Sequence, residues 1–142
     1  MPADTLTFTG SVAAPLEKVF SLLTDPTRLT GWLPGCVAAQ AHGPMKVGTR
    51  LEVRFQRGNT VFEIIDWHPP TAFGWSETGG RRGTKTLFKL DFAGGSTVVT
   101  MRHVWTPQGL RAWFLGAILR RRNARIHFEW MLNNLRMLVT RS

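Results

Sequence analysis

The fold of this chain is decided by its C-terminal stretch, residues 106–142, which reads TPQGLRAWFLGAILRRRNARIHFEWMLNNLRMLVTRS. Apolar residues recur in it at steps of three, four and seven, the spacing that places side chains on one stripe of an α-helix. This stripe consists of Leu110, Phe114, Ala117, Ala124, Phe128, Met131, Leu135 and Leu138. At about 1.5 Å per residue, thirty helical residues would span roughly 45 Å, enough to cross a small domain. Such a helix needs a broad apolar surface to pack against, and the preceding residues should supply it.

A polar run at residues 120–123, with the sequence RRRN, interrupts this pattern. Arg121 is the only polar residue on the stripe. The run is either an outward-facing segment of one helix or a kink that divides a shorter helix from a longer one. The periodicity alone leaves both interpretations open.

The composition is that of a single globular domain covering residues 1–142. With 43% apolar residues, including six Trp and nine Phe, the chain can bury roughly two-thirds of its surface. The single cysteine, Cys36, cannot form an internal disulfide, and the N-terminus has neither the basic region nor the long apolar run of a signal peptide. No apolar stretch reaches the roughly 18 residues of a membrane span, so we expect a cytoplasmic protein without a transmembrane segment.

Motifs for cofactors and metals are missing from the sequence. It contains no P-loop, no dinucleotide-type glycine fingerprint and no His/Cys cluster with the spacing of metal ligands. We therefore expect neither a cofactor nor a metal site.

The net charge of +9 is concentrated in the C-terminal part of the chain. Residues 1–99 hold ten Lys or Arg against eight Asp or Glu, whereas residues 100–142 hold eight Arg against Glu129 alone. This asymmetry favours an anionic surface or an acidic partner. Alternatively, the arginines form the solvated back of the long helix, with their stems packed on it. We expect no nucleic-acid binding, because no nucleic-acid motif accompanies the charge.

The residues before the long helix indicate one strand, two short helices and six further strands. Residues 5–12 alternate between apolar and polar side chains, as a half-buried strand does. Pro15 suits the first turn of a helix that ends near Thr24, and Asp25-Pro26 suits the start of a second, with Asp25 as its N-cap. The further strands are predicted at residues 37–42, 49–57, 61–67, 73–75, 84–92 and 97–105.

The short connections between these strands predict an antiparallel sheet. One face of that sheet can take the long helix, which gives a two-layer α+β domain. A strongly twisted sheet would curl around the helix, and the two short helices would close one end of the gap between them.

Several short motifs, in their order along the chain, carry a family resemblance. They are Ala14-Pro15 with Val19-Phe20, Leu23-Thr24-Asp25-Pro26, Leu29, Trp32-Leu33-Pro34-Gly35, Val47-Gly48-Thr49, Pro69-Pro70 before Phe73, Gly95-Ser96-Thr97 and Asn134-Leu135-Arg136. The chain resembles the helix-grip superfamily that joins START lipid-transfer domains, the birch-pollen allergen family and the bacterial polyketide cyclase/dehydrase group. The resemblance implies a curved antiparallel sheet of about seven strands around the C-terminal helix, with two short helices after the first strand. Members bind lipids, hormones or polyketides, act as cyclases or dehydratases, or regulate a chaperone.

The aromatic residues favour an apolar cavity between sheet and helix. Pockets lined by aromatic side chains and a few polar groups suit hydrophobic ligands. The predicted lining residues are Trp75, Phe88, Met101, His103, Trp105, Phe128 and Trp130. His127 and Trp130 flank the helical stripe, where they either reach the pocket mouth or form a solvated shoulder. The alternative to a cavity is that the rings fill the interior completely.

His103 is the candidate catalytic residue. On its strand it shares a face with Met101 and Trp105, so it would point into the cavity as a general acid/base or a hydrogen-bond anchor, unless it points outward or has a structural role. Thr84 or Thr86 would assist it.

Three functions are therefore compatible with the sequence. The first is binding of a small hydrophobic ligand, and the second is a cyclase or dehydratase using His103. The third is an interaction or co-chaperone-like role of the basic residues, which are Arg120, Arg121, Arg122 and Arg125. Binding through these arginines should weaken steeply with salt, whereas apolar binding should not. The sequence does not fix the oligomeric state.

Overall fold

The computed structural model describes residues 4–56, 58–78, 84–105 and 110–141 of the chain. Within these ranges, the side chains of Asp4, Trp105 and residues 110–121 lie outside the description. The elements are β1 (Asp4–Val12), α1 (Leu16–Thr24), the 3-10 helix η1 (Pro26–Arg28), α2 (Leu29–Trp32), β2 (Cys36–Ala41), β3 (Arg50–Phe55), β4 (Gly58–His68), β5 (Ala72–Thr78), β6 (Lys85–Ala93), β7 (Ser96–Trp105) and α3 (Leu110–Arg141).

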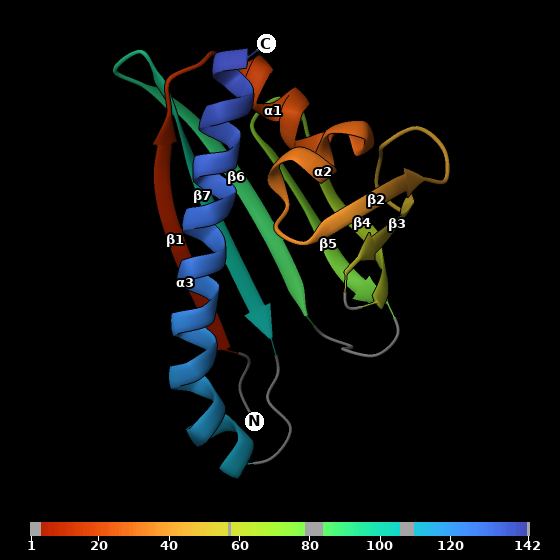
Figure 1. Ribbon diagram of the computed structural model, residues 1–142, viewed down its shortest axis with the longest axis vertical. Helices are drawn as coiled ribbons and strands as arrows, with labels where there is room; N and C mark the ends of the chain where they lie inside the picture. Colours follow the sequence, from red (N-terminus) through yellow and green to blue (C-terminus); the bar gives the residue numbers. More distant parts are fainter. Residues whose placement is uncertain (1–3, 57, 79–83, 106–109, 142) are drawn as a thin grey trace.

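All seven strands form one antiparallel sheet in the order β1-β7-β6-β5-β4-β3-β2. Strands β2 to β7 follow one another as neighbours, and β1 returns to the β7 edge. The sheet curves, with α3 lying along its inner face beside β1, β7 and β6, while α1 and α2 cover the upper part of that face (Figure 1). The predicted α+β helix-grip class is thereby confirmed, with two short helical segments after the first strand.

The two short helical segments begin where the sequence signals predict. Pro15 is the N-cap of α1, whose inner face buries Val19, Phe20 and Leu23. At the start of η1, the Asp25 carboxylate accepts hydrogen bonds from the Thr27 amide at 3.0 Å and from the Thr27 hydroxyl at 2.8 Å. The carboxylate satisfies an amide that the first turn of a helix otherwise leaves unpaired.

Helix α3 runs without interruption for 32 residues and continues through residues 120–123. Its described part buries Phe128, Met131 and Leu135 of the predicted stripe, while Ala124 and Leu138 are half-buried. Leu132 is buried as well, although it was not on the predicted stripe. Gly10 of β1 leaves the space that Leu132 occupies, because a Cβ atom at that position would lie 2.5 Å from Leu132 Cδ2.

Two polar contacts also join α3 to other elements. The Asn134 amide donates a hydrogen bond to the Trp32 carbonyl in α2 at 3.3 Å. On the opposite side of the helix, Arg136 Nε donates to the Ser11 carbonyl in β1 at 3.1 Å. Together with the apolar contacts, these bonds fix the rotation of α3 about its own axis.

The interior between sheet and short helices is filled by aromatic rings. Trp32 lies 6.4 Å from Trp75 and 6.2 Å from Phe88, and Phe73 stacks on Phe88 at 4.6 Å, all between ring centroids. The Trp32 indole N–H donates to the Leu22 carbonyl at 3.0 Å, so the buried ring leaves no unpaired donor. Here the aromatic residues do fill the space, as one interpretation of the sequence expected.

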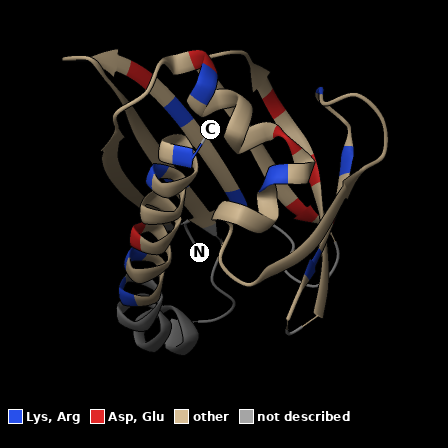
Figure 2. Cartoon of the chain, turned by 45° about the horizontal axis from the view of Figure 1, so that its top comes forward, with Lys and Arg blue, Asp and Glu red and all other residues tan. Residues whose placement is uncertain are grey.

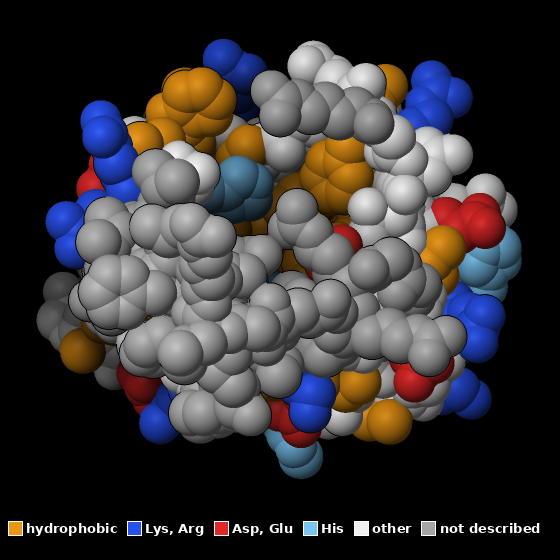
Figure 3. Space-filling view, turned by 90° about the horizontal axis from the view of Figure 1, so that it is seen from below, with side chains coloured by type: hydrophobic (Ala, Val, Ile, Leu, Met, Phe, Trp, Pro, Cys, Tyr) orange, Lys and Arg blue, Asp and Glu red, His pale blue; other side chains and the backbone are white. Residues whose placement is uncertain are grey.

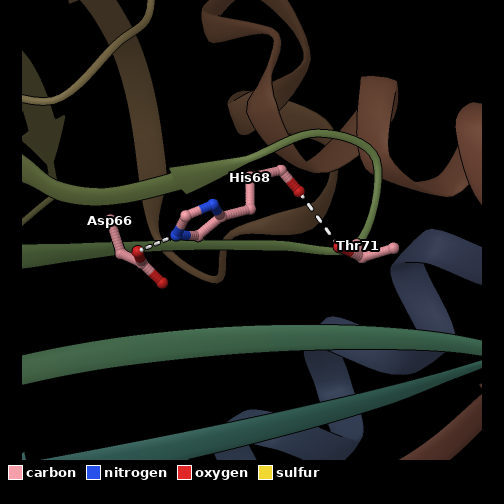
Figure 4. A network of polar contacts seen from close by, with 3 residues as sticks. All are labelled: Asp66, His68 and Thr71. Carbon is pink, nitrogen blue, oxygen red and sulfur yellow. Dashed lines mark hydrogen bonds and ion pairs between the residues drawn. The ribbon is translucent and has the colours of Figure 1, made fainter.

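Two histidines lie on the outside of the sheet. His68, at the end of β4, pairs with Asp66 at 2.8 Å, and its carbonyl accepts from the Thr71 hydroxyl at 3.2 Å (Figure 4). His42, after β2, pairs with Glu52 at 3.2 Å. Both imidazoles are exposed, so neither belongs to an internal site.

None of the described helices combines the length and the apolar character that crossing a lipid bilayer requires.

Candidate functional site: a cavity between the sheet and helix α3

A cavity of about 550 Å³ opens between the inner face of the sheet and α3. Figure 3 looks into this end of the molecule and shows a hollow with hydrophobic side chains inside it and histidine at its edge. The described lining residues come from the loop after α2, from strands β3 to β7 with the residue before β6, and from α3. They are Leu33, Phe55, Phe62, Trp75, Glu77, Thr84, Thr86, Phe88, Met101, His103, Asn123, Ala124, His127 and Met131.

The strand register arranges the sheet side of the cavity in rows across β5, β6 and β7. Phe88 pairs with Met101, and this apolar row adjoins the aromatic core. In the next row, Thr86 pairs with Trp75 on one side and with His103 on the other. On β6 and β7, successive inward residues therefore change from apolar to polar along the cavity, which gives it an apolar end and a more polar end.

The polar row contains a direct contact between two side chains. Thr86 Oγ1 lies 3.3 Å from His103 Nδ1, and the tautomer of the imidazole decides which of the two atoms donates. Both side chains are half-buried. The contact orients the imidazole at the wall of the cavity, where it can exchange a hydrogen bond or a proton with a bound molecule.

Helix α3 forms the opposite wall with residues one helical turn apart. Ala124, His127 and Met131 follow at steps of three and four, so they share the side of α3 that faces the cavity. His127 lies at the edge of this side and keeps part of its surface in solvent. Desolvation by the surrounding protein nevertheless lowers the pKa of His127 below its usual value of 6.5, which favours the neutral imidazole.

At pH 6.5, where a free histidine is half protonated, we expect more than half of the His127 imidazole to be neutral. Because the unfolded chain takes up this proton more readily than the folded protein, the free energy of unfolding should fall as the pH drops below 6.5. An NMR titration of the imidazole signals, assigned with His127→Gln, measures the pKa directly. A midpoint at or above 6.5 would contradict the expected shift.

The sequence-predicted lining residues have four different positions in the structure. Those that line the cavity are Trp75, Phe88, Met101 and His103. The side chain of Trp105 lies outside the described residues. Phe128 is buried against β1 instead, stacking on Phe8 at 5.6 Å. Trp130 is 63% exposed and is not among the described residues that line the cavity, which agrees with the solvated shoulder that the sequence left open for it.

Both threonines proposed as helpers of His103, Thr84 and Thr86, line the cavity. Seven further residues line the cavity although the sequence did not identify them as lining residues: Leu33, Phe55, Phe62, Glu77, Asn123, Ala124 and Met131. Ala124 and Met131 belong to the predicted apolar stripe of the helix, and that position could have identified them as residues facing the sheet.

Of the predicted basic residues, Arg122 and Arg125 are exposed on α3. The side chains of Arg120 and Arg121 lie outside the described residues. Arg125 borders a second, shallower hollow of about 520 Å³ between β1 and α3, together with Glu129 and Arg136. This hollow is on the other side of the helix from the cavity.

The described residues do not favour a metal site or a cysteine nucleophile. They contain no group of three or more His, Cys, Asp or Glu side chains close enough to hold a metal ion. Cys36 is half-buried, and its thiol donates to the Ala38 carbonyl at 3.6 Å. Burial raises the pKa of the Cys36 thiol, which disfavours the thiolate that a nucleophile needs.

Comparisons with solved structures find the same fold over nearly the whole chain. A polyketide-cyclase-like protein of Corynebacterium glutamicum, Cgl2372, is 28% identical, with 99% of this chain and 94% of that chain covered and a TM-score of 0.65. The Aha1 dimer of Colwellia psychrerythraea is 19% identical (94% and 96% covered, TM-score 0.71). Protein NE0264 of Nitrosomonas europaea is 12% identical (96% and 94% covered, TM-score 0.79). The two likenesses below 25% identity establish the fold alone.

Among curated protein sequences, no significant match to the chain is found. A family model, described as polyketide cyclase/dehydrase and lipid transport, matches residues 4–140. Because that match covers all but the ends of the chain, the protein belongs to the polyketide cyclase/dehydrase and lipid transport family.

Proposed function

We propose that this protein binds a small, mainly apolar ligand in the cavity between the sheet and α3. The observation that carries the proposal is the cavity of about 550 Å³ itself, with its aromatic and aliphatic end and its row of polar side chains. Ligand pockets in proteins have volumes of about 300–1,000 Å³ and a mostly apolar lining with a few polar groups.

The two ends of the cavity have different tasks in this proposal. Phe88 and Met101, with Trp75 in the neighbouring row, remove the apolar part of the ligand from water, which supplies most of the affinity. Thr86 and His103 hydrogen-bond a polar group of the ligand and so fix its direction. The family description, which includes lipid transport, supports a ligand of this class.

A substitution that occupies part of the cavity should weaken ligand binding without unfolding the protein. Ala124 faces the cavity from α3, so Ala124→Phe places a ring inside it, whereas Ile126→Phe adds a ring on the outer side of the same helix. We expect Ala124→Phe to weaken binding of the neutral dye Nile red at least about tenfold. Ile126→Phe should bind the dye like the unaltered protein. Fluorescence titration measures both.

Native mass spectrometry of the purified protein would test for a co-purified molecule, which Ala124→Phe should lose. The proposal fails if neither the dye nor any small molecule binds, or if dye binding is the same in Ala124→Phe and Ile126→Phe.

Catalysis is the second candidate function, and the Thr86–His103 contact favours it. An imidazole held by a hydroxyl in a partly dehydrated cavity can act as a general base on an acidic C–H or O–H of a bound polyketide-like substrate. His103→Gln keeps the size and a hydrogen bond but cannot transfer the proton. If such a substrate is converted, this variant should lower kcat at least about 100-fold with little change in KM. Unchanged turnover would exclude His103 as the base.

A further inference from the structure

The outward side of α3 carries apolar side chains that the core does not use. Ile126, Trp130 and Met137 are exposed by 44%, 63% and 52%. At 100° per residue, their positions lie within about 40° of one another around the helix axis, opposite the buried Leu135. They therefore form one straight ridge along the helix, about 16 Å long.

Basic side chains accompany this ridge. Helix α3 contains seven Arg and one acidic residue, Glu129. In its described part, Arg122, Arg125 and Arg141 are exposed, and blue segments recur along the helix in Figure 2 with a single red one. Arg136 is also exposed, although its Nε is bonded to the Ser11 carbonyl. The charge of this helix side is complementary to an anionic surface.

We propose that this outer face of α3, defined by Arg122, Ile126, Trp130, Met137 and Arg141, docks onto an anionic lipid bilayer. A helix with a basic side and Trp, Ile and Met side chains lies in the interface of such a membrane, with its apolar residues among the acyl chains and its arginines at the phosphates. Trp is suited to this depth because its ring is apolar while its N–H can remain hydrated.

The shape of the face favours a bilayer over an acidic protein partner. Ile126, Trp130 and Met137 form a narrow convex ridge on a helix whose other side is fixed to the sheet. A protein interface of standard size needs about 800 Å² on each partner, with a well-packed apolar centre, which the three side chains of the described part of this face do not provide. A fluid bilayer needs no complementary shape, because lipids rearrange around the inserted side chains.

Vesicle flotation with the unaltered protein tests the proposal. We expect binding to phosphatidylcholine vesicles that contain about 30% phosphatidylserine, weak binding to pure phosphatidylcholine, and release as NaCl is raised from about 0.1 to 0.5 M. Trp130→Ser should weaken binding about tenfold. Arg122→Gln with Arg141→Gln should weaken it about fivefold for each arginine removed.

Matched changes elsewhere on the surface are the controls. Phe92→Ser removes an exposed aromatic side chain from β6, and Arg50→Gln with Arg54→Gln removes two exposed arginines from β3. These variants should bind vesicles like the unaltered protein, and so should Ala124→Phe, because the docking face does not depend on the cavity. Absence of binding to the anionic vesicles would overturn the proposal. Equal effects of Trp130→Ser and Phe92→Ser would also overturn it, since they would indicate adsorption without a defined face.

Discussion

Replacing Trp32 by alanine is expected to lower the free energy of unfolding by about 3–5 kcal/mol, because the change leaves a large cavity in the aromatic core. The side chain is 0% exposed and lies against the rings of Trp75 and Phe88. The loss also removes the indole N–H bond to the Leu22 carbonyl and leaves that acceptor without this partner.

Urea unfolding followed by circular dichroism measures this effect. Trp130→Ala is the matched control, because it removes the same side chain from an exposed position, and it should change the unfolding free energy by less than about 0.5 kcal/mol. Trp32→Phe keeps an aromatic ring but lacks the N–H, so its free energy of unfolding should lie between those of Trp32→Ala and Trp130→Ala. If Trp32→Ala and Trp130→Ala had similar unfolding free energies, the described packing of α2 on the sheet would be wrong.

Replacing Leu135 by alanine should lower the free energy of unfolding by about 2–5 kcal/mol, the range for a fully buried leucine. Leu135 is 0% exposed in the middle of the buried side of α3, whereas Met137, two residues later, is 52% exposed. Because α3 covers the inner face of the sheet, the cost reflects how tightly the helix is docked there.

Met137→Ala is the control, and its free energy of unfolding should differ from that of the unaltered protein by less than about 0.5 kcal/mol. Urea unfolding gives both differences, and amide hydrogen exchange shows whether α3 opens separately from the sheet. A small effect of Leu135→Ala together with a large effect of Met137→Ala would mean that the helix is rotated from its described position.

Local chemistry explains why so much of the fold was predictable. The Asp25-Pro26 signal acts within a few residues, and the predicted N-cap has the expected bond to Thr27. Alternation in β3 and β7 fixed which residues share a face, so His103 was correctly placed with Met101. The steps of three and four in α3 identified Phe128, Met131 and Leu135 as buried.

The cavity was less predictable because its lining comes from elements far apart in the sequence. Phe55 reaches it through the curvature of the sheet and Leu33 through the packing of α2, and no local pattern encodes either. For Trp130 the sequence left the pocket mouth and a solvated shoulder open, and the side chain is exposed because its angular position on α3 lies far from that of Leu135. Phe128 is buried as expected but on the β1 side of the helix.

The pairing of β1 with β7 also constrains the order of folding during synthesis. Asp4 pairs with Trp105, and among the described strands β1 has no neighbour in the sheet other than β7. A ribosome adding about 5–20 residues per second needs roughly 5–20 s to make the intervening residues. During that time the nine residues of β1 have no partner strand to pair with, while the consecutive hairpins from β2 to β7 can form as they leave the ribosome. Closing the sheet is therefore a late, long-range step, and changes in β1 should slow folding less than changes in the β6–β7 hairpin.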